Sequence, residues 1–132
     1  MLGRCLNIFV ADDDPSVAEG LSLVLRAKGH RIESATDGIQ AFARLTEQPG
    51  EFGLLIVDNT MPGLTGSELI QKLRAVNFNG KIMVLSGYLS PTLEDAYRAL
   101  GVEYIVHKPY EISTIRTAVE EIEAATLAPG QE

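Results

Sequence analysis

Cysteine and histidine are scarce in this 132-residue chain, which contains one cysteine, Cys5, and two histidines, His30 and His107. A single cysteine cannot form an intramolecular disulfide or a cysteine-based zinc site. The histidines lie far apart, and neither has a second histidine or a cysteine at metal-ligand spacing. We therefore expect no zinc chemistry, a buried structural thiol at Cys5, and two histidines on the surface or in loops.

Positive charge and long apolar runs are also in short supply. Eleven basic residues stand against eighteen acidic ones, a net charge of −7, which argues against a general surface for nucleic acids or anionic membranes. The longest aliphatic run, residues 54–57, is too short to span a bilayer. The first residues also lack the apolar region of a secretory signal. We expect a cytoplasmic protein with no direct nucleic-acid or membrane partner.

The rest of the composition is that of an ordinary globular domain. Hydrophobic residues make up 45% of the chain and charged residues 22%, and the length suits one compact domain. We expect a single domain over residues 1–132, with a core over about residues 6–126 and a frayed tail at 127–132.

Strand and helix patterns alternate five times along the chain. Asp14 before Pro15, and Thr65 three residues before Glu68, are typical of helix N-termini. The expected strands are residues 6–11, 31–35, 53–57, 81–85 and 104–107, and the helices between and after them run from 15, 38, 66, 91 and 111. The second helix is expected to stop at Pro49-Gly50. This order predicts an α/β fold, with a parallel sheet covered by helices on both faces.

Polar residues gather where the predicted strands end. Three acids, Asp12, Asp13 and Asp14, follow the first strand, and Asp58 follows the third. Ser86 and Lys108 follow the fourth and fifth. In open parallel sheets the functional site lies beyond the carboxyl ends of the strands, so we expect these side chains on one rim.

Crowded carboxylates on such a rim need a compensating cation. Two unit charges about 4 Å apart repel by roughly 4 kcal/mol at an effective dielectric of about 20. Carboxylates without nearby imidazole or thiolate favour a hard ion such as Mg²⁺. A lysine and a hydroxyl add donors for phosphoryl oxygens, and a carboxylate can attack phosphorus. These residue types indicate phosphoryl transfer onto a protein carboxylate.

The motifs at residues 12–15, 58–66, 86–88 and 108–109 together resemble the receiver (response regulator, CheY-like) domain of two-component systems. The resemblance covers about residues 7–125. It implies a flavodoxin-like, doubly wound (βα)5 fold whose strands are ordered 2-1-3-4-5. It also implies a signalling phosphoprotein that catalyses its own phosphorylation and dephosphorylation but does not turn over an external substrate.

The resemblance also assigns the metal site and the phosphoacceptor. Asp58 would accept a phosphoryl group from a phosphohistidine on a histidine kinase or a histidine phosphotransfer protein. Asp13 and Asp58 would bind Mg²⁺ directly, and Asp12 largely through water. Thr60 would offer its backbone carbonyl to the metal.

Two further residues would respond to the phosphoryl group. The resemblance implies that Lys108 holds it and that the Ser86 hydroxyl swings toward it. That movement would reach the surface formed by the fourth helix, fifth strand and fifth helix, where the downstream partner would bind.

Two positions modify this picture. Receivers often have an aromatic residue three positions before the lysine, but this chain has Ile105 there. Tyr104, one residue earlier, should face the other side of its strand. Tyr88 lies two residues beyond Ser86, and we expect its ring to shield the phosphoryl group from water.

Other functions remain open at this point. A receiver that is never phosphorylated could serve as a docking module. A phosphohydrolase with an Asp-x-Asp motif would use Asp12 as nucleophile and Asp14 as acid–base, although Asp14 also suits a helix cap. A flavin-binding module is disfavoured because the acids after the first strand would repel the cofactor phosphate. The chain could be a stand-alone regulator or the receiver of a larger protein.

Overall fold

A computed structural model describes residues 6–48 and 50–126 and contains one parallel sheet. The strands are ordered β2-β1-β3-β4-β5, as predicted. Their bounds are β1 Asn7–Ala11, β2 Arg31–Ala35, β3 Leu54–Asp58, β4 Lys81–Ser86 and β5 Tyr104–His107. Asp58 and Ser86 are therefore the last residues of β3 and β4, whereas the sequence pattern predicts that each follows directly after its strand.

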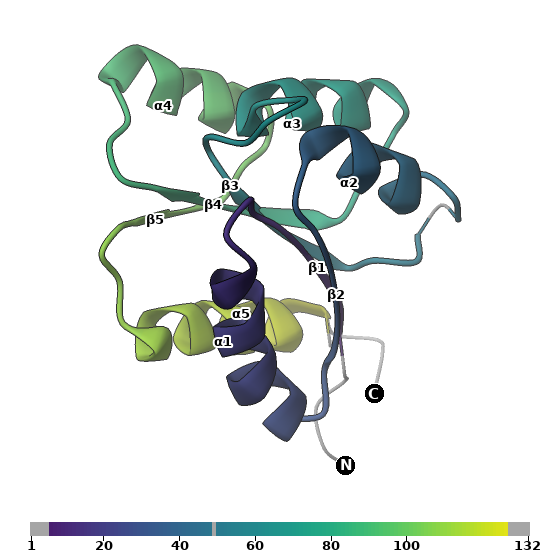
Figure 1. Ribbon diagram of the computed structural model, residues 1–132, viewed down its shortest axis with the longest axis vertical. Coiled ribbons are helices and arrows are strands. Elements are labelled where there is room, and N and C mark those ends of the chain that lie inside the picture. The colour runs from purple at the N-terminus through teal and green to yellow at the C-terminus, as the bar shows by residue number, and fades with distance from the viewer. Residues whose placement is uncertain (1–5, 49, 127–132) are drawn as a thin grey trace.

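Helices cover both faces of the sheet (Figure 1). Helices α1 (Pro15–Ala27) and α5 (Ile112–Thr126) pack on one face. Helices α2 (Gly38–Leu45), α3 (Gly66–Ala75) and α4 (Pro91–Ala99) pack on the other. Among the described residues, no helix is long and apolar enough to cross a membrane.

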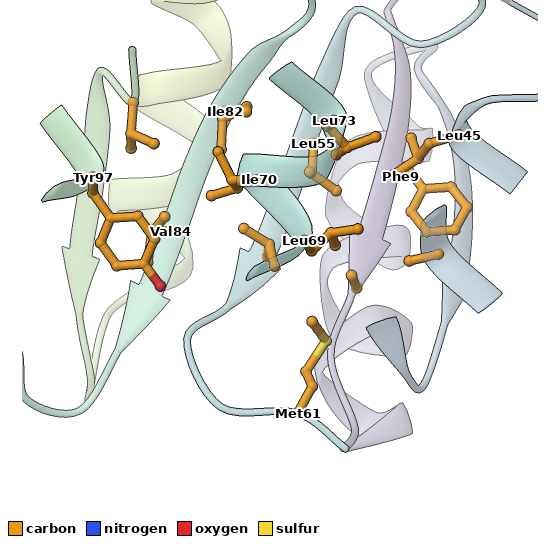
Figure 2. Packing of buried hydrophobic residues seen from close by; sticks show 14 of the residues in the cluster. Phe9, Leu45, Leu55, Met61, Leu69, Ile70, Leu73, Ile82, Val84 and Tyr97 are labelled. Atoms are coloured by element: carbon orange, nitrogen blue, oxygen red, sulfur yellow. The ribbon is translucent and has the colours of Figure 1, made fainter. Parts of the chain in front are cut away.

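Two hydrophobic cores lie on either side of this sheet. The core beneath α2, α3 and α4 includes Phe9, Leu55, Val84 and the ring of Tyr97 (Figure 2). The core beneath α1 and α5 is built from the side chains of alternate strand positions. All five residues of β3 are buried because helices cover both of its faces.

Local sequence signals set the beginnings of the helices. Asp14 caps α1, accepting a hydrogen bond from the Ser16 backbone N–H at 3.0 Å. Thr65 and Glu68 form the predicted capping box at the start of α3. Both predicted caps are confirmed. Each satisfies backbone N–H donors that the helix itself leaves unpaired.

Two expectations require correction. His30 is not a surface residue: it is 5% exposed, and its Nδ1 accepts the Leu6 backbone N–H at 2.9 Å, so it serves the start of β1. His107 is exposed, as predicted. Helix α2 ends at Leu45, before the expected stop, where the Thr46 hydroxyl donates to a backbone carbonyl one turn earlier. Cys5, Pro49 and the tail at 127–132 lie outside the described residues.

The start of α2 touches the loop that follows β3. The Gly38 backbone N–H donates to the carbonyl of Pro62 at 3.1 Å. A Cβ at Gly38 would lie 2.5 Å from the Leu64 Cβ and 2.6 Å from the Leu64 carbonyl oxygen. This contact, and not a special backbone angle, requires glycine at position 38.

We predict that Gly38→Ala lowers the free energy of unfolding by about 1–3 kcal/mol, because backbone must move to admit the methyl group. Gly20→Ala is the matched control. Gly20 lies inside α1 with nothing within 4 Å of an added Cβ, so alanine there should stabilise by about 0.5–1 kcal/mol. Urea unfolding of both variants measures the difference, and equal stabilities for the two would contradict the assigned contact.

Candidate functional site

The ends of β1 and β3 bring three carboxylates together. The two strands are parallel neighbours, with Ala11 paired to Val57, so the residues that follow lie side by side. Ligand oxygens of Asp12, Asp13 and Asp58 all lie within 4.8 Å of one another. Asp12 and Asp58 are buried and Asp13 is exposed. The structure thus brings together the three acids that the sequence placed on one rim.

Asp12 is the most constrained member of this acidic cluster. Its Oδ1 accepts the Asp14 backbone N–H at 2.9 Å, but its buried Oδ2 has no hydrogen-bond partner. Burial, followed by the negative charge of Asp58, raises the pKa of Asp12 to about 6, although the backbone hydrogen bond opposes this shift. A divalent cation would supply the partner that Oδ2 lacks and relieve the repulsion.

The acidic cluster has a donor set that fits such a cation. Asp12, Asp13 and Asp58 offer only carboxylate oxygens, and no imidazole or thiolate joins them in the described residues. Hard cations with oxygen ligands suit this set. The orphaned Asp12 oxygen is the structural observation that favours a metal over a merely crowded surface.

Both oxygens of Asp58 are held by donors. The Lys108 ammonium donates to Oδ1 at 2.7 Å, and the Thr60 backbone N–H donates to Oδ2 at 3.2 Å. Burial disfavours the charge of Lys108, but the hydrogen bond and attraction to Asp58 outweigh it and raise the pKa of the ammonium. Asp58 is thereby fixed next to a permanent positive charge.

Ser86 belongs to the same rim, but its hydroxyl is bonded to a group other than Asp58. Its hydroxyl donates to the Tyr88 carbonyl at 3.0 Å. The Lys108 backbone N–H donates to the Ser86 carbonyl at 2.7 Å, which ties the ends of β4 and β5 together. The Tyr88 side chain is 76% exposed. The Ser86 hydroxyl would therefore have to rotate to reach a group on Asp58.

The first two residues of β5 lie on opposite faces of the sheet. Ile105 packs against the core beneath α2, α3 and α4, whereas Tyr104 packs against the core beneath α1 and α5. The expected separation of these two side chains is confirmed. The tyrosine of β5 therefore lies on the face of the sheet away from α4.

Three residues near the acceptor were missed as site residues. The hydroxyl of Tyr97, a residue of the core beneath α4, donates to Oδ1 of Asn59, next to Asp58. A tyrosine on an inward helix face signals a hidden polar partner, because its buried hydroxyl needs one. Burial, followed by the charge of Asp12, raises the pKa of Tyr110. Its position two residues after Lys108 was the available signal.

Several known proteins are similar to this chain in sequence. The family of response regulator receiver domains matches residues 8–120. Response regulator receiver protein CpdR of Brucella abortus is 30% identical over 122 residues, 92% of this chain and 98% of that protein. Sensor protein EvgS of Escherichia coli is 30% identical over 125 residues, 94% of this chain but 10% of that protein.

The relatives differ greatly in length. The chain also matches transcriptional regulatory protein ZraR of Klebsiella oxytoca, 28% identical over 127 residues, and spans 28% of it and 96% of this chain. The chain thus spans nearly all of one of these relatives and only a small part of the others.

Solved structures agree with the sequence match. The receiver domain of the Francisella response regulator 1452 has a TM-score of 0.83 at 25% identity, covering 92% of this chain and 98% of that one. Chemotaxis protein CheY4 of Vibrio cholerae has a TM-score of 0.80 at 25% identity, covering 90% and 99%. Together with the acids and lysine at the strand ends, the match over residues 8–120 shows that the chain belongs to the response regulator receiver domain family of two-component systems.

Proposed function

We propose that this protein is a phosphoacceptor receiver that takes a phosphoryl group onto Asp58 in a Mg²⁺-dependent reaction. The donor is a phosphohistidine of a histidine kinase or histidine phosphotransfer protein. One observation supports the proposal above the others: Asp58 pairs with Lys108 at 2.7 Å beside a buried, unpartnered oxygen of Asp12. The protein changes state by this reaction and turns over no external substrate.

Each residue of the rim has a defined task in this transfer. An oxygen of Asp58 attacks phosphorus, the P–N bond to the donor imidazole breaks, and its electron pair returns to nitrogen. Lys108, which already donates to Asp58, shifts to an oxygen of the arriving group. Mg²⁺ held by Asp12, Asp13, Asp58 and the Thr60 carbonyl would neutralise charge on the phosphoryl oxygens.

The same reaction changes the α4–β5–α5 surface. The Ser86 hydroxyl leaves the Tyr88 carbonyl and donates to the phosphoryl group, which frees the segment that follows β4. Between β5 and α5 lies a groove of about 520 Å³, lined by residues that include Tyr104, Ile105 and Thr117. We assign the downstream protein partner to this surface.

The structure weighs differently on the two alternatives. Asp14 caps α1 through the backbone N–H and hydroxyl of Ser16, which counts against its use as the acid–base of an Asp-x-Asp phosphohydrolase. A docking module that is never phosphorylated would not require the pairing of Lys108 with Asp58. The phosphorylation experiment below tests this alternative.

Incubation with acetyl phosphate and Mg²⁺ should add one phosphoryl group to the wild-type protein, as measured by intact mass. The adduct should require Mg²⁺ and vanish in Asp58→Asn, because the amide is not a nucleophile. Asp95→Asn, the same replacement at an exposed position of α4, should leave formation of the adduct unchanged. An adduct that persists in Asp58→Asn would refute the assigned acceptor. A wild-type protein that neither acetyl phosphate nor phosphorylated kinases modify would instead be a docking module.

Asp12→Asn should raise the free energy of unfolding at pH 7.5 without Mg²⁺ by about 1–3 kcal/mol. The pKa of Asp12, raised from 3.8 to about 6 in the folded state, means that its protonated form stabilises the fold below pH 4. This stabilisation is lost as pH rises through 6, so the gain of the variant should fade toward pH 4.

Mg²⁺ provides the control for this comparison. It should stabilise the wild type at pH 7.5 by binding the acidic cluster, and stabilise Asp12→Asn less. Urea unfolding of both proteins at pH 7.5 and at pH 4, with and without Mg²⁺, measures the free energies of unfolding that are compared. A variant whose stability follows that of the wild type at every pH would show that the Asp12 carboxylate carries no such cost.

Tyr88→Ala should shorten the lifetime of the phosphoryl group, because its exposed ring can fold over the acceptor and hinder the attacking water. Tyr88→Phe keeps the ring and should keep the wild-type lifetime. Decay of the adduct after removal of acetyl phosphate, followed by intact mass, gives the rates. Equal decay in all three proteins would rule out shielding by this residue.

A further inference from the structure

We propose that Tyr97 is a positioning residue for the phosphoacceptor: its hydroxyl holds Asn59 and thereby ties the segment after Asp58 to helix α4. The inference rests on the proposed function, since it gives Tyr97 a part in phosphoryl transfer to Asp58.

The hydrogen bond of Tyr97 joins two distant parts of the chain. Tyr97 lies in α4, is fully buried, and donates to Oδ1 of Asn59, thirty-eight positions earlier. Its ring lies beside Val84, and its hydroxyl points toward the ends of the strands that carry the acidic cluster (Figure 2). Since Asn59 follows Asp58 directly, the hydroxyl acts one residue from the acceptor.

Asn59 is held by three elements at once. Its backbone N–H donates to the Leu85 carbonyl at 2.9 Å, and its carbonyl accepts the Gly66 backbone N–H at 3.0 Å. Helix α4 supplies the third hold through the hydroxyl of Tyr97. Asn59 is thus fixed to β4, α3 and α4.

The start of α3 leaves room for this hydroxyl. A Cβ at Gly66 would lie 3.0 Å from the Tyr97 hydroxyl oxygen and 2.7 Å from the Asp58 carbonyl oxygen. A residue larger than glycine would therefore displace either the hydroxyl or the acceptor's own backbone. This close fit shows that the hydroxyl is part of the loop's packing and does not merely border it.

The hydroxyl also responds to the charge on the acceptor. Burial, and then the negative charge of Asp58, raise the pKa of Tyr97 to about 12. The group therefore remains a hydrogen-bond donor at neutral pH. A phosphoryl group on Asp58 would add negative charge in the same field and alter the strength of the bond to Asn59.

Tyr97 supplies a hydroxyl on the α4 side of the sheet, the side on which β5 places Ile105. Ile105 packs in the same core as Tyr97 but has no donor, and Tyr104 lies on the other face. Coupling between two sites is reciprocal. A hydrogen bond through which α4 holds the acceptor loop therefore also carries a change in that loop to α4.

The first test compares rates of phosphorylation by acetyl phosphate with Mg²⁺. Tyr97→Phe removes the hydroxyl and keeps the ring, so adduct formation should slow by about two- to tenfold, as expected for one lost hydrogen bond. Thr46→Val, which removes a hydroxyl that bonds only to backbone carbonyls of α2, should react like the wild type. An unchanged rate in Tyr97→Phe would overturn the inference.

A double variant separates positioning from general destabilisation. If Tyr97 acts through Asn59, then Tyr97→Phe should cause no further slowing in an Asn59→Ala background. A purely structural role would give two slowing factors that multiply, and that result would overturn the inference. Urea unfolding of each variant identifies any loss of folded protein.

Hydrogen exchange of the α4 amides is an independent measurement of the coupling between Asp58 and α4. Acetyl phosphate with Mg²⁺ should change exchange in residues 91–99 of the wild type and of Thr46→Val, and change it less in Tyr97→Phe. An equal change in all three would refute the coupling. A wild type that acetyl phosphate and phosphorylated kinases leave unmodified would refute the proposed function and this inference together, whereas a phosphorylated wild type with an indifferent Tyr97→Phe would refute the inference alone.

Discussion

Repulsion between Asp12 and Asp58 is the constraint around which the rim of this domain is organised. The pairing of β1 with β3 forces the two buried carboxylates together, and burial strengthens their interaction because little water screens it. Lys108 offsets the charge of Asp58 directly, while one oxygen of Asp12 is left without a partner. The site is thus prepared to bind positive charge and, next to it, a phosphoryl group.

The loop between β3 and α3 connects this charged rim to the helices. It touches α2 through Gly38, α3 through Gly66 and α4 through Tyr97. Two of these contacts require glycine because a Cβ would meet backbone atoms. The segment that carries the acceptor is consequently packed on several sides, and a change of charge at Asp58 has short paths into neighbouring elements.

Much of the architecture follows from local sequence. The apolar strands, the caps at Asp14 and Thr65, and the polar residues at the strand ends depend on neighbours within a few positions. His30 was misjudged because its partner, the Leu6 N–H, lies twenty-four positions away. The end of α2 was misplaced because the Thr46 hydroxyl satisfies a helix carbonyl, a choice that periodicity does not reveal.

The sequence by itself determined the α/β class, the order of elements and the set of groups at the strand ends, because periodicity and capping are short-range properties. Only the tertiary structure decided which of these groups meet. It paired Lys108 with Asp58, turned Ser86 toward Tyr88, and joined Tyr97 to Asn59. Such contacts depend on the three-dimensional packing of distant segments and on side-chain rotamers, and neither is encoded in the local pattern of residues.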